Sequence, residues 1–365
     1  MQNHIGVMDM QKKYKYAVII GRFQPVHNAH IKLMETGLEV AEKILIVLGS
    51  ANSLQTIKNP FTINQRKEMI LSCFDQSLHN RIVMTEVEDS IYSDPDWVIA
   101  VETLVKNASI DVNNKEITII AHDKDETTYY LNMFKQWKPT QVESIKSSID
   151  GPPISATKIR ELLFEGYLNL VGAVCPQSVV NWLNVFSQTE EFKYLREEYN
   201  SALEYDLQYE NIPYGQVNFV TVDSLVVQSG HVLLVQRGVS PYPNSWALPG
   251  GHLNINETFL EGAIRELKEE TQIKVPDKVL KGSLVYERIF DHPDRSLRGR
   301  TKRKIGRTIT KLHVFKLDDS IDLPRVVGSD DAKKAWFFTF AEVKAMRSQM
   351  FEDHWDMIMH ALNRI

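Results

Sequence analysis

Residues 21–30 read GRFQPVHNAH, and they continue directly from the apolar run YAVIIG at residues 16–21. The apolar run predicts a buried strand, and the segment AHIKLMETGLEVA (29–41) has the spacing of an amphipathic helix. Gly21 allows a close approach of the backbone, and Pro25 restricts the turn between strand and helix. The sequence therefore predicts a strand that passes through a tight turn into a helix.

His27 and His30 fall at the predicted N-terminus of that helix. Free N–H groups and the helix dipole favour an anion there, and imidazoles can donate hydrogen bonds to phosphate oxygens. A metal site is a weaker interpretation, because zinc sites usually need three or four ligands and no third ligand is evident. The spacing of the two histidines is also compatible with a structural role, in which they pack in the turn and bind no ligand.

The rest of the first half alternates strands with helices. Apolar runs predict strands at 44–50, 81–87 and 116–122, and helical spacing predicts helices at 63–74, 96–107, 126–134 and 155–166. This alternation indicates an α/β fold with a parallel sheet covered on both faces. Such sheets bind ligands at the carboxyl ends of their strands, which is where GRFQPVHNAH is expected.

The segment ISATKIR (154–160) opens the last of these helices. Ser155 is a natural N-cap residue, and Thr157 and Arg160 lie in the first turns of the helix. A hydroxyl, free amides and a guanidinium at one helix N-terminus can bind a polyphosphate. Ordinary helix capping is the alternative for this pattern taken alone.

In the second half, VNFVTVDSLVVQ (217–228) and the residues after QSGH predict a β-hairpin. A helix is predicted over 257–271, and it places Glu266, Glu269 and Glu270 on one flank. Three carboxylates this close repel one another unless a cation lies among them, and hard oxygen ligands favour Mg²⁺ or Mn²⁺. A solvated helix face with Arg265 salt bridges is the alternative.

Composition sets limits on the whole chain. Its 365 residues are enough for two domains, and 43% of them are apolar. The net charge of −5 does not suggest a nucleic-acid partner. Cys73 and Cys175 are too few for a disulfide framework, and no apolar run approaches the length of a signal peptide or membrane span. We therefore expect a cytoplasmic protein without a membrane partner.

The two motifs of the first half resemble G-x-F-x-P-x-H-x-x-H and I-S-x-T-x-x-R of the nucleotidylyltransferase superfamily. GSANSLQTIKNPFTINQR (49–66) and SDPDWV (93–98) further resemble archaeal-type nicotinamide mononucleotide (NMN) adenylyltransferases. The resemblance implies a Rossmann-like domain that transfers AMP from ATP to NMN, giving NAD and pyrophosphate. A related transferase that uses nicotinate mononucleotide or phosphopantetheine as acceptor is the alternative.

The same resemblance implies the roles of individual residues. His27, His30 and Arg160 would hold the ATP phosphates during catalysis, and Trp97 would stack on the nicotinamide ring. Trp97 could equally be a core tryptophan, and the cations at positions 22 and 58 could be ordinary surface charges. The full set of substrate-binding residues that we predict is Gly21, Arg22, Phe23, Lys58, Trp97, Ser155 and Thr157.

In the second half, the spacing from Gly251 through Glu257 to RELKEE (265–270) resembles the Nudix box, and WALPGG precedes it as usual. The resemblance implies an α+β Nudix domain that uses Mg²⁺, or alternatively Mn²⁺, as cofactor. Glu266 and Glu270 would be the main metal ligands, with Glu269 nearby, and Glu270 would be catalytic. Glu257 would orient Arg265. Gln272 replaces the late glycine of the box, so a changed helix C-cap with intact chemistry is expected.

The substrate of the second half is less constrained by its sequence. FDHPDRSLRGRT (290–301) is similar to Nudix domains that hydrolyse ADP-ribose to AMP and ribose 5-phosphate, and residues 302–308 lengthen this basic segment. Asp330 and Asp331 are candidates for a general base. A Nudix-shaped sensor that binds a nucleotide without cleaving it is the alternative function.

These observations predict the organisation of the chain. Residues 1–13 form a flexible leader. Residues 14–205 form the nucleotidylyltransferase domain with its C-terminal helices and linker, and residues 206–365 form the Nudix hydrolase domain. The expected partners are ATP, NMN and ADP-ribose, and a homo-oligomer is left open.

Overall fold

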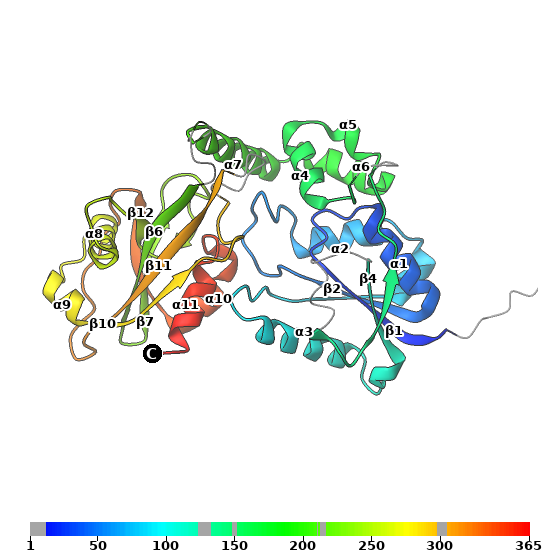
Figure 1. Cartoon of the computed structure of the whole chain (residues 1–365), viewed down its shortest axis with the longest axis horizontal. Coiled ribbons are helices and arrows are strands. Elements are labelled where there is room, and N and C mark those ends of the chain that lie inside the picture. Colours follow the sequence, from blue (N-terminus) through cyan, green and yellow to red (C-terminus); the bar gives the residue numbers. More distant parts are fainter. Residues whose placement is uncertain (1–11, 123–132, 148–151, 210, 212–216, 298–304) are drawn as a thin grey trace, which may run out of the picture. The chain divides into compact units, whose positions relative to one another are not determined.

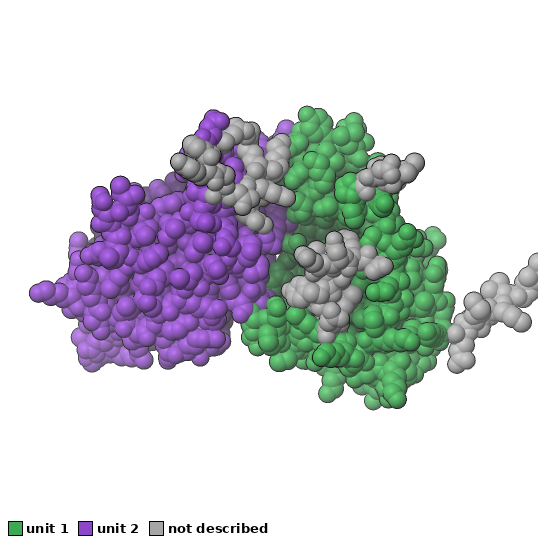
Figure 2. All heavy atoms as spheres, in the orientation of Figure 1, with its two compact units in different colours: residues 1–51, 61–89, 93–188 green, residues 52–60, 90–92, 189–365 purple. Residues whose placement is uncertain are grey.

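The computed structural model describes residues 12–122, 133–147, 152–209, 211, 217–297 and 305–365. It divides into two compact units (Figures 1 and 2). Unit 1 comprises residues 1–51, 61–89 and 93–188, and unit 2 comprises residues 52–60, 90–92 and 189–365. Within the described parts of the chain, no helix has the length and apolar character needed to cross a bilayer.

Unit 1 is built on a five-stranded sheet in the order β3-β2-β1-β4-β5, and all neighbouring strands are parallel. This confirms the predicted α/β fold. The chain fills the sheet outward from β1 to β3 and then crosses to β4, so the strand order reverses beside β1. The strands are β1 (Tyr14–Gly21), β2 (Ala41–Leu48), β3 (Ile82–Glu86), β4 (Ile117–His122) and β5 (Lys138–Val142).

Helices cover both faces of this sheet (Figure 1). On one face, a Cβ at Gly37 of α1 would meet the side chains of Ile44, Ala17 and Ile120. On the other face, Val101 of α3 packs in a cluster with alternate strand residues such as Val18. The elements are α1 (Asn28–Val40), α2 (Ile63–Leu71), α3 (Asp94–Ala108), α4 (Ala156–Glu165), α5 (Leu168–Val171) and α6 (Gln177–Phe186), with short 3₁₀ turns at Gln76–Arg81 and Asn114–Glu116.

Strand β5 was not predicted from the sequence. It contains Pro139 and is largely polar, whereas the other strands are continuous apolar runs. Its position at the sheet edge explains this, because an edge strand has one solvent-facing side on which a proline costs no ladder hydrogen bond. The predicted helix at 126–134 lies almost entirely outside the described residues, as does the predicted leader.

Unit 2 contains a mixed sheet in the order β10-β11-β6-β7-β12, in which only β11 and β6 run parallel along this path. The predicted hairpin is present, and Ser229 and Gly230 form its turn with φ of 48° and 73°. The strands are β6 (Val217–Gln228), β7 (His231–Arg237), β8 (Trp246–Ala247), β9 (Gly250–His252), β10 (Leu284–Phe290), β11 (Gly306–Lys316) and β12 (Ala332–Thr339).

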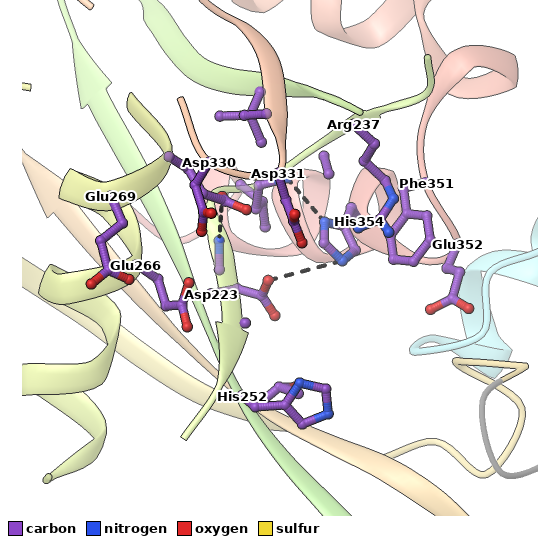
Figure 3. Close-up of a pocket in the computed structure, with 18 of the residues that line it drawn as sticks. Asp223, Arg237, His252, Glu266, Glu269, Asp330, Asp331, Phe351, Glu352 and His354 are labelled. Carbon is purple, nitrogen blue, oxygen red and sulfur yellow. Dashed lines mark hydrogen bonds and ion pairs between the residues drawn. The ribbon is translucent and has the colours of Figure 1, made fainter. Parts of the chain in front are cut away.

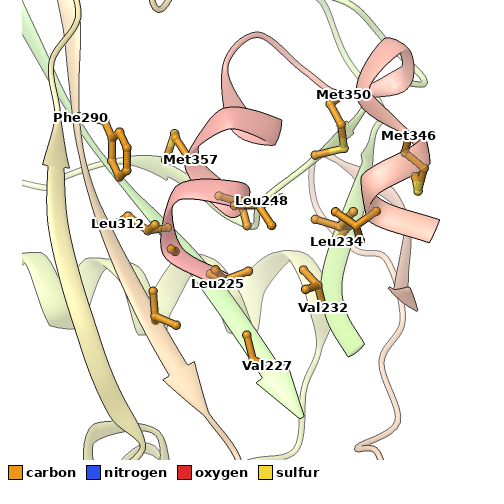
Figure 4. Packing of buried hydrophobic residues seen from close by; sticks show 14 residues of the cluster. Leu225, Val227, Val232, Leu234, Leu248, Phe290, Leu312, Met346, Met350 and Met357 are labelled. Atoms are coloured by element: carbon orange, nitrogen blue, oxygen red, sulfur yellow. The ribbon is translucent and has the colours of Figure 1, made fainter. Parts of the chain in front are cut away.

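Alternation along β6 divides the core of unit 2 between the two faces of the sheet. Leu225 and Val227 pack in a cluster with Met357 of α11 (Figure 4), whereas Val226 packs in a cluster with Leu267 of α8. The helices are α7 (Glu190–Leu207), α8 (Phe259–Thr271), α9 (Asp277–Gly282), α10 (Phe340–Ala345) and α11 (His354–Leu362), with a 3₁₀ turn at Arg347–Gln349.

The domain boundary predicted near residue 205 differs from this grouping, which assigns α7 to unit 2. Buried Glu198 of α7 accepts hydrogen bonds from the Tyr242 amide, at 2.8 Å, and from the Ser240 hydroxyl, at 3.3 Å. Tyr205 of α7 also contacts the Phe219 ring, with 5.7 Å between centroids. These contacts join α7 to residues that follow it by tens of positions, so local sequence patterns do not reveal them.

Two short segments of the first half also belong to unit 2. Leu54, from segment 52–60, packs against the cluster that contains Val226. Tyr92, from segment 90–92, packs edge-on against Phe290, with 4.8 Å between ring centroids. Both segments follow carboxyl ends of strands, β2 and β3 respectively. Unit 2 therefore includes residues that lie within the sequence of the first half.

Gln272 ends helix α8 in the left-handed region, with φ of 50° and ψ of 25°, and its N–H donates to the carbonyl of Lys268. The helix thus ends where a glycine would end it, but with a side chain in a disfavoured conformation. We expect Gln272→Gly to raise the free energy of unfolding of unit 2 by roughly 0.5–1 kcal/mol, because glycine adopts this conformation without strain. Urea unfolding monitored by circular dichroism measures the change, and a lower midpoint would contradict it.

Candidate active sites

The first candidate site is a cavity of about 610 Å³ in unit 1, at the carboxyl end of β1. It brings together the turn after β1 and the start of α4, as the sequence predicts for a polyphosphate site. The predicted residues that line it are Arg22, Phe23, His27, His30, Ser155, Thr157 and Arg160.

Arg160 connects the two motifs. Its Nη1 donates to the carbonyl oxygen of Gln24 at 2.7 Å, and its Nη2 donates to Thr157 Oγ1 at 3.2 Å. Burial, and then the nearby charge of Arg22, lower the pKa of Arg160 to about 9, so the guanidinium remains charged at neutral pH. A buried cation at the wall of an open cavity is suited to a multiply charged anion.

The two histidines lie against each other at the start of α1. Their rings stack with 3.7 Å between centroids, and the Phe23 ring packs edge-on against His30 at 4.8 Å. Phe23 has φ of 51°, and a Cβ on Gly21 would lie 2.9 Å from its ring. Glycine at position 21 is therefore required by this ring packing, and it contributes to the site indirectly.

Ser155 occupies the N-cap position of α4, but its side chain makes no capping hydrogen bond. Thr157 is exposed at the cavity and accepts from Arg160. Capping, the alternative interpretation of this motif, therefore does not account for the serine hydroxyl. Both hydroxyls are available to a ligand in the cavity.

Three predicted substrate-binding residues do not line this cavity. Gly21 lies behind Phe23, as described above. Lys58 belongs to unit 2, where its Nζ lies 3.4 Å from Asp294 Oδ2. Trp97 packs against the core cluster under α3, with its ring 5.9 Å from that of Phe134. The core interpretation of Trp97 thus has direct structural support, and its stacking role stays a prediction.

Sequence reasoning missed three polar residues that organise this site. The Gln24 amide exchanges two hydrogen bonds with the backbone of Phe61, and Nε2 of His122 lies 2.9 Å from the carbonyl of Ala29. Arg66 is fully buried and donates to the carbonyls of Arg22, Gly49 and Ser50, which fixes the turns after β1 and β2. An arginine among the apolar positions of α2 was the available signal.

The second candidate site is a cavity of about 340 Å³ in unit 2 (Figure 3). Its walls come from the sheet, from α8, from the turn before β12 and from residues 351–354. The predicted residues that line it are Arg265, Glu266, Glu269, Glu270, Asp330 and Asp331. The carboxylates and the loop that carries the candidate general base therefore share one cavity.

Arg265 organises the acidic flank of α8. Its Nε and Nη2 donate to the two carboxylate oxygens of Glu257 at 2.9 and 2.7 Å, as predicted for an orienting residue. Its Nη1 donates to Glu266 at 2.8 Å and Glu269 at 2.9 Å. Glu261 instead closes a capping box with Thr258, so it takes no part in this network.

The two glycines of the PGG sequence allow β9 to approach its neighbours. A Cβ on Gly250 would lie 2.2 Å from the carbonyl oxygen of Val222, and one on Gly251 would lie 2.7 Å from Oε1 of Glu266. The Gly250 amide donates to Oε2 of Glu270 at 3.0 Å. A side chain at position 251 would displace the Glu266 carboxylate, and one at position 250 would push β9 away from Val222 and Asp223.

Burial and mutual repulsion dominate the electrostatics of these carboxylates. Desolvation, and then the neighbouring Glu266 charge, raise the pKa of Glu270 to about 8 against the opposing hydrogen bond from Gly250. Burial also raises the pKa of Glu266, although Arg265 opposes this. Burial and repulsion therefore disfavour the ionised forms of these carboxyl groups in the protein alone, and a bound cation would favour them.

No cluster of three or more acidic, histidine or cysteine side chains in the described residues has the arrangement of a preformed metal site. Arg265 explains this, because it occupies oxygens of Glu266 and Glu269 while Glu270 binds a backbone amide. The donor chemistry nevertheless fits Mg²⁺ or Mn²⁺, since the carboxylates supply hard oxygen ligands at one cavity wall. Glu266 and Glu270, with Glu269 nearby, are the residues that would hold the ion.

Two further residues of the cavity were missed by sequence reasoning. Asp223 is a lone carboxylate in the apolar strand β6; burial raises its pKa to about 6, and it accepts from the Thr310 hydroxyl at 2.5 Å. His354 accepts from the Leu248 amide at Nδ1, and its Nε2 lies 3.9 Å from Asp223. A charged residue inside an apolar strand was the available signal for Asp223.

The basic segment that extends to residue 308 in the sequence leads into a strand. Residues 306–316 form β11, which lies in the middle of the sheet and pairs with β6 and β10. The alternation GRTITKLHVF explains this, since its threonine, leucine and valine side chains are buried. The most basic part, residues 298–304, lies outside the described residues.

Two protein families match the chain, and they match its two halves. The cytidylyltransferase-like family matches residues 18–162, and the NUDIX domain family matches residues 217–361. A nicotinamide/nicotinic acid mononucleotide adenylyltransferase from Acinetobacter baylyi is 36% identical over 189 residues, which are 52% of this chain and 95% of the relative. A nicotinamide-nucleotide adenylyltransferase from Pyrococcus furiosus is 29% identical over 50% of this chain and 89% of the relative.

A solved structure matches both halves together. It is a bifunctional NMN adenylyltransferase/ADP ribose pyrophosphatase from Francisella tularensis, crystallised with AMP and a manganese ion. It is 31% identical, with a TM-score of 0.83, and the match covers 96% of this chain and 99% of that chain. The chain therefore belongs to the family of bifunctional proteins that join an NMN-adenylyltransferase-type nucleotidylyltransferase domain to a Nudix domain.

Proposed function

We propose that the chain is a bifunctional enzyme of NAD metabolism. Unit 1 transfers AMP from ATP to NMN, which gives NAD and pyrophosphate. Unit 2 hydrolyses ADP-ribose, with one water, to AMP and ribose 5-phosphate. The best support is that the phosphate-binding residues and the acidic residues lie in two separate cavities of one chain. A bifunctional NMN adenylyltransferase/ADP ribose pyrophosphatase also matches 96% of this chain.

The adenylyl transfer needs alignment and charge neutralisation. The NMN phosphate is already ionised at neutral pH, so no general base is required for its attack on the α-phosphorus of ATP. His27 and His30 donate hydrogen bonds to the phosphates, and Arg160 opposes the charge that develops on pyrophosphate. Arg22, Phe23, Ser155 and Thr157 complete the wall that orients the substrate.

The hydrolysis needs an activated water and a neutralised diphosphate. A divalent cation supplies both when bound, and Glu266, Glu269 and Glu270 would hold it. Glu257 keeps Arg265 aligned along the same flank of α8. Asp330 and Asp331 line the same cavity, and we assign the general base to one of them.

Product analysis tests both reactions directly. The protein is incubated with ATP and NMN, and separately with ADP-ribose and other nucleoside diphosphate derivatives, with Mg²⁺ or Mn²⁺ present in each case. We expect NAD with pyrophosphate from the first mixture, and AMP with ribose 5-phosphate from the second. If the protein bound ADP-ribose but did not cleave it with Mg²⁺ or Mn²⁺ present, a nucleotide sensor would be favoured. The complete set of carboxylates argues against that alternative.

Trp97→Ala tests the nicotinamide contact. We expect the affinity for NMN to fall roughly three- to tenfold, because stacking on an aromatic ring contributes about 0.5–1.5 kcal/mol beyond area burial. ATP affinity should change little, and Trp97→Phe should restore most NMN binding because it keeps a flat ring. Calorimetric titration with each nucleotide measures this. If both affinities fell together in the alanine variant, Trp97 would be a core residue only.

The remaining features of the proposal concern its surroundings. We place the enzyme in the cytoplasm, where its nucleotide substrates are available and two cysteines remain reduced. We expect no nucleic-acid partner.

A further inference from the structure

Arg295 presents a cation at the wall of the hydrolase cavity, although it is 95% buried. Its Nε and Nη2 donate to the two carboxylate oxygens of Asp353 at 3.1 and 3.0 Å, and Nη2 also lies 3.3 Å from the sulfur of Met357. Its backbone N–H donates to the carbonyl oxygen of His292 at 3.0 Å. The bidentate pair fixes the plane of the guanidinium and leaves Nη1 as the group that can meet a ligand.

Asp353 has a second donor, and that donor comes from the first half of the chain. The Tyr92 hydroxyl donates to Oδ2 of Asp353, which is the same oxygen that accepts from Nε of Arg295. Asp353 is 97% buried, so its orientation depends on these two partners rather than on water. The Tyr92 ring is itself held by Phe290.

The neighbouring backbone is anchored in the same way. The Ser296 hydroxyl and the Leu297 amide both donate to Oε1 of Glu352, at 3.0 and 3.1 Å. Hydrogen bonds therefore hold residues 295–297 against residues 352–353. Arg295 is thus a fixed cation that lines the same cavity as the carboxylates of α8 that would hold a metal.

We propose that Tyr92 is a positioning residue of the hydrolase cavity: through Asp353 it holds the Arg295 guanidinium so that Nη1 binds a phosphate oxygen of the nucleoside diphosphate substrate. The inference rests on the proposed hydrolase function. It adds a substrate-binding cation, Arg295, and makes the hydrolase cavity dependent on a tyrosine that lies more than 120 residues before the Nudix-type sequence match. Tyr92 itself touches no substrate.

The test uses the full-length protein and two tyrosine variants. Tyr92→Phe keeps the ring against Phe290 and removes only the hydroxyl. Tyr286→Phe is the matched control, because Tyr286 packs against the same core cluster but its hydroxyl lies 3.3 Å from His360, which does not line the cavity. The measurements are kcat and KM for ADP-ribose hydrolysis, the Kd for ADP-ribose in EDTA, the rate of NAD synthesis and the thermal unfolding midpoint.

We expect Tyr92→Phe to raise both KM and Kd for ADP-ribose roughly three- to tenfold, which is the scale of one hydrogen bond. A contact that acts on substrate binding should leave kcat within about twofold of the wild type. NAD synthesis should be unchanged, and Tyr286→Phe should match the wild type throughout. In an Arg295→Lys background, which cannot form the bidentate pair, Tyr92→Phe should have no further effect on KM or Kd.

Each other outcome is decisive. If wild type is active and Tyr92→Phe has the KM and Kd of the wild type or of Tyr286→Phe, the inference is wrong while the proposed function stands. If Tyr92→Phe lowers the unfolding midpoint and NAD synthesis together, or acts equally in the Arg295→Lys background, Tyr92 has only a structural role. If wild type neither binds nor hydrolyses ADP-ribose, the proposed function fails and the inference fails with it.

Discussion

We expect His30→Ala to lower NAD synthesis at least ~10²-fold, which is the scale for removing one preorganised donor from a transition state. His30 lies at the cavity wall and stacks on His27 at 3.7 Å, so its loss removes one donor and also the support of the other. The Phe23 ring loses its edge contact in the same variant. Steady-state assays with saturating ATP and NMN measure the effect.

Two controls separate this loss of a donor from loss of the fold. His30→Asn retains a side-chain donor, and we expect it to keep more activity than the alanine variant. His30→Ala should hydrolyse ADP-ribose at the wild-type rate, because His30 lies in unit 1 whereas the hydrolase cavity lies in unit 2. Near-wild-type NAD synthesis by a folded His30→Ala protein would show that the polyphosphate site does not depend on this histidine.

Local patterns in the sequence were sufficient to predict most of the two architectures. The strands of unit 1 are continuous apolar runs, and α8 begins with a capping box at Thr258 and Glu261 that specifies its first turn. The motif at 21–30 and the helix at 156–165 meet in one cavity because both lie at the end of the sheet where β1 terminates. The residues that define each strand, helix or motif lie close together in the sequence, and the parallel-sheet topology brings the two motifs to one cavity.

The features that could not be predicted depend on contacts between residues far apart in the sequence. Helix α7 joins unit 2 through Glu198 and Tyr242, and strand β5 is specified by its edge position rather than by its polar composition. In the hydrolase cavity, Asp223, Arg295 and His354 come from three separate segments, and only Asp223 stands out in its own segment, as a charged residue in an apolar strand. Only the packed sheet shows that they are buried together.

The acidic flank of α8 shows a third limit of sequence reasoning. The spacing of Glu266, Glu269 and Glu270 predicts a metal site, whereas the structure shows Arg265 bound to two of these carboxylates. Both interpretations of the sequence are therefore partly realised, since salt bridges and cavity-facing carboxylates coexist on the same helix. Arg265 partly neutralises the repulsion among these carboxylates by pairing with Glu266 and Glu269. Buried Glu270 accepts instead from the Gly250 amide and has no cationic hydrogen-bond partner among the described residues.

Glu270→Gln should lower ADP-ribose hydrolysis at least ~10²-fold, since even residues that only support metal ligands contribute about 10- to 100-fold. The substitution keeps the size of the side chain, and the amide oxygen can still accept from the Gly250 amide at the position where the carboxylate accepts now. It removes one negative charge from the set that would hold the ion. Mn²⁺ affinity measured by calorimetry should fall in parallel with activity.

The same substitution should leave the fold and the other reaction intact. It replaces a carboxyl group whose ionised form is disfavoured by burial and by Glu266 and Asp223 with a neutral amide, so the unfolding midpoint should not fall. Glu261→Gln is the matched control, because Glu261 lies on the same helix but outside the cavity and a glutamine preserves the capping box. This control should hydrolyse ADP-ribose and bind Mn²⁺ like the wild type.

The mirror variant His27→Ala completes the comparison, and we expect it to lose NAD synthesis and keep hydrolysis. The rates of both reactions are measured for both variants, and these four rates show whether the two cavities act independently. If Glu270→Gln stopped NAD synthesis while circular dichroism showed an intact fold, the two reactions would have to share a site or be coupled through the chain. If it hydrolysed ADP-ribose at the wild-type rate, Glu270 would not belong to the metal-binding set, and Glu266 with Glu269 would have to supply it alone.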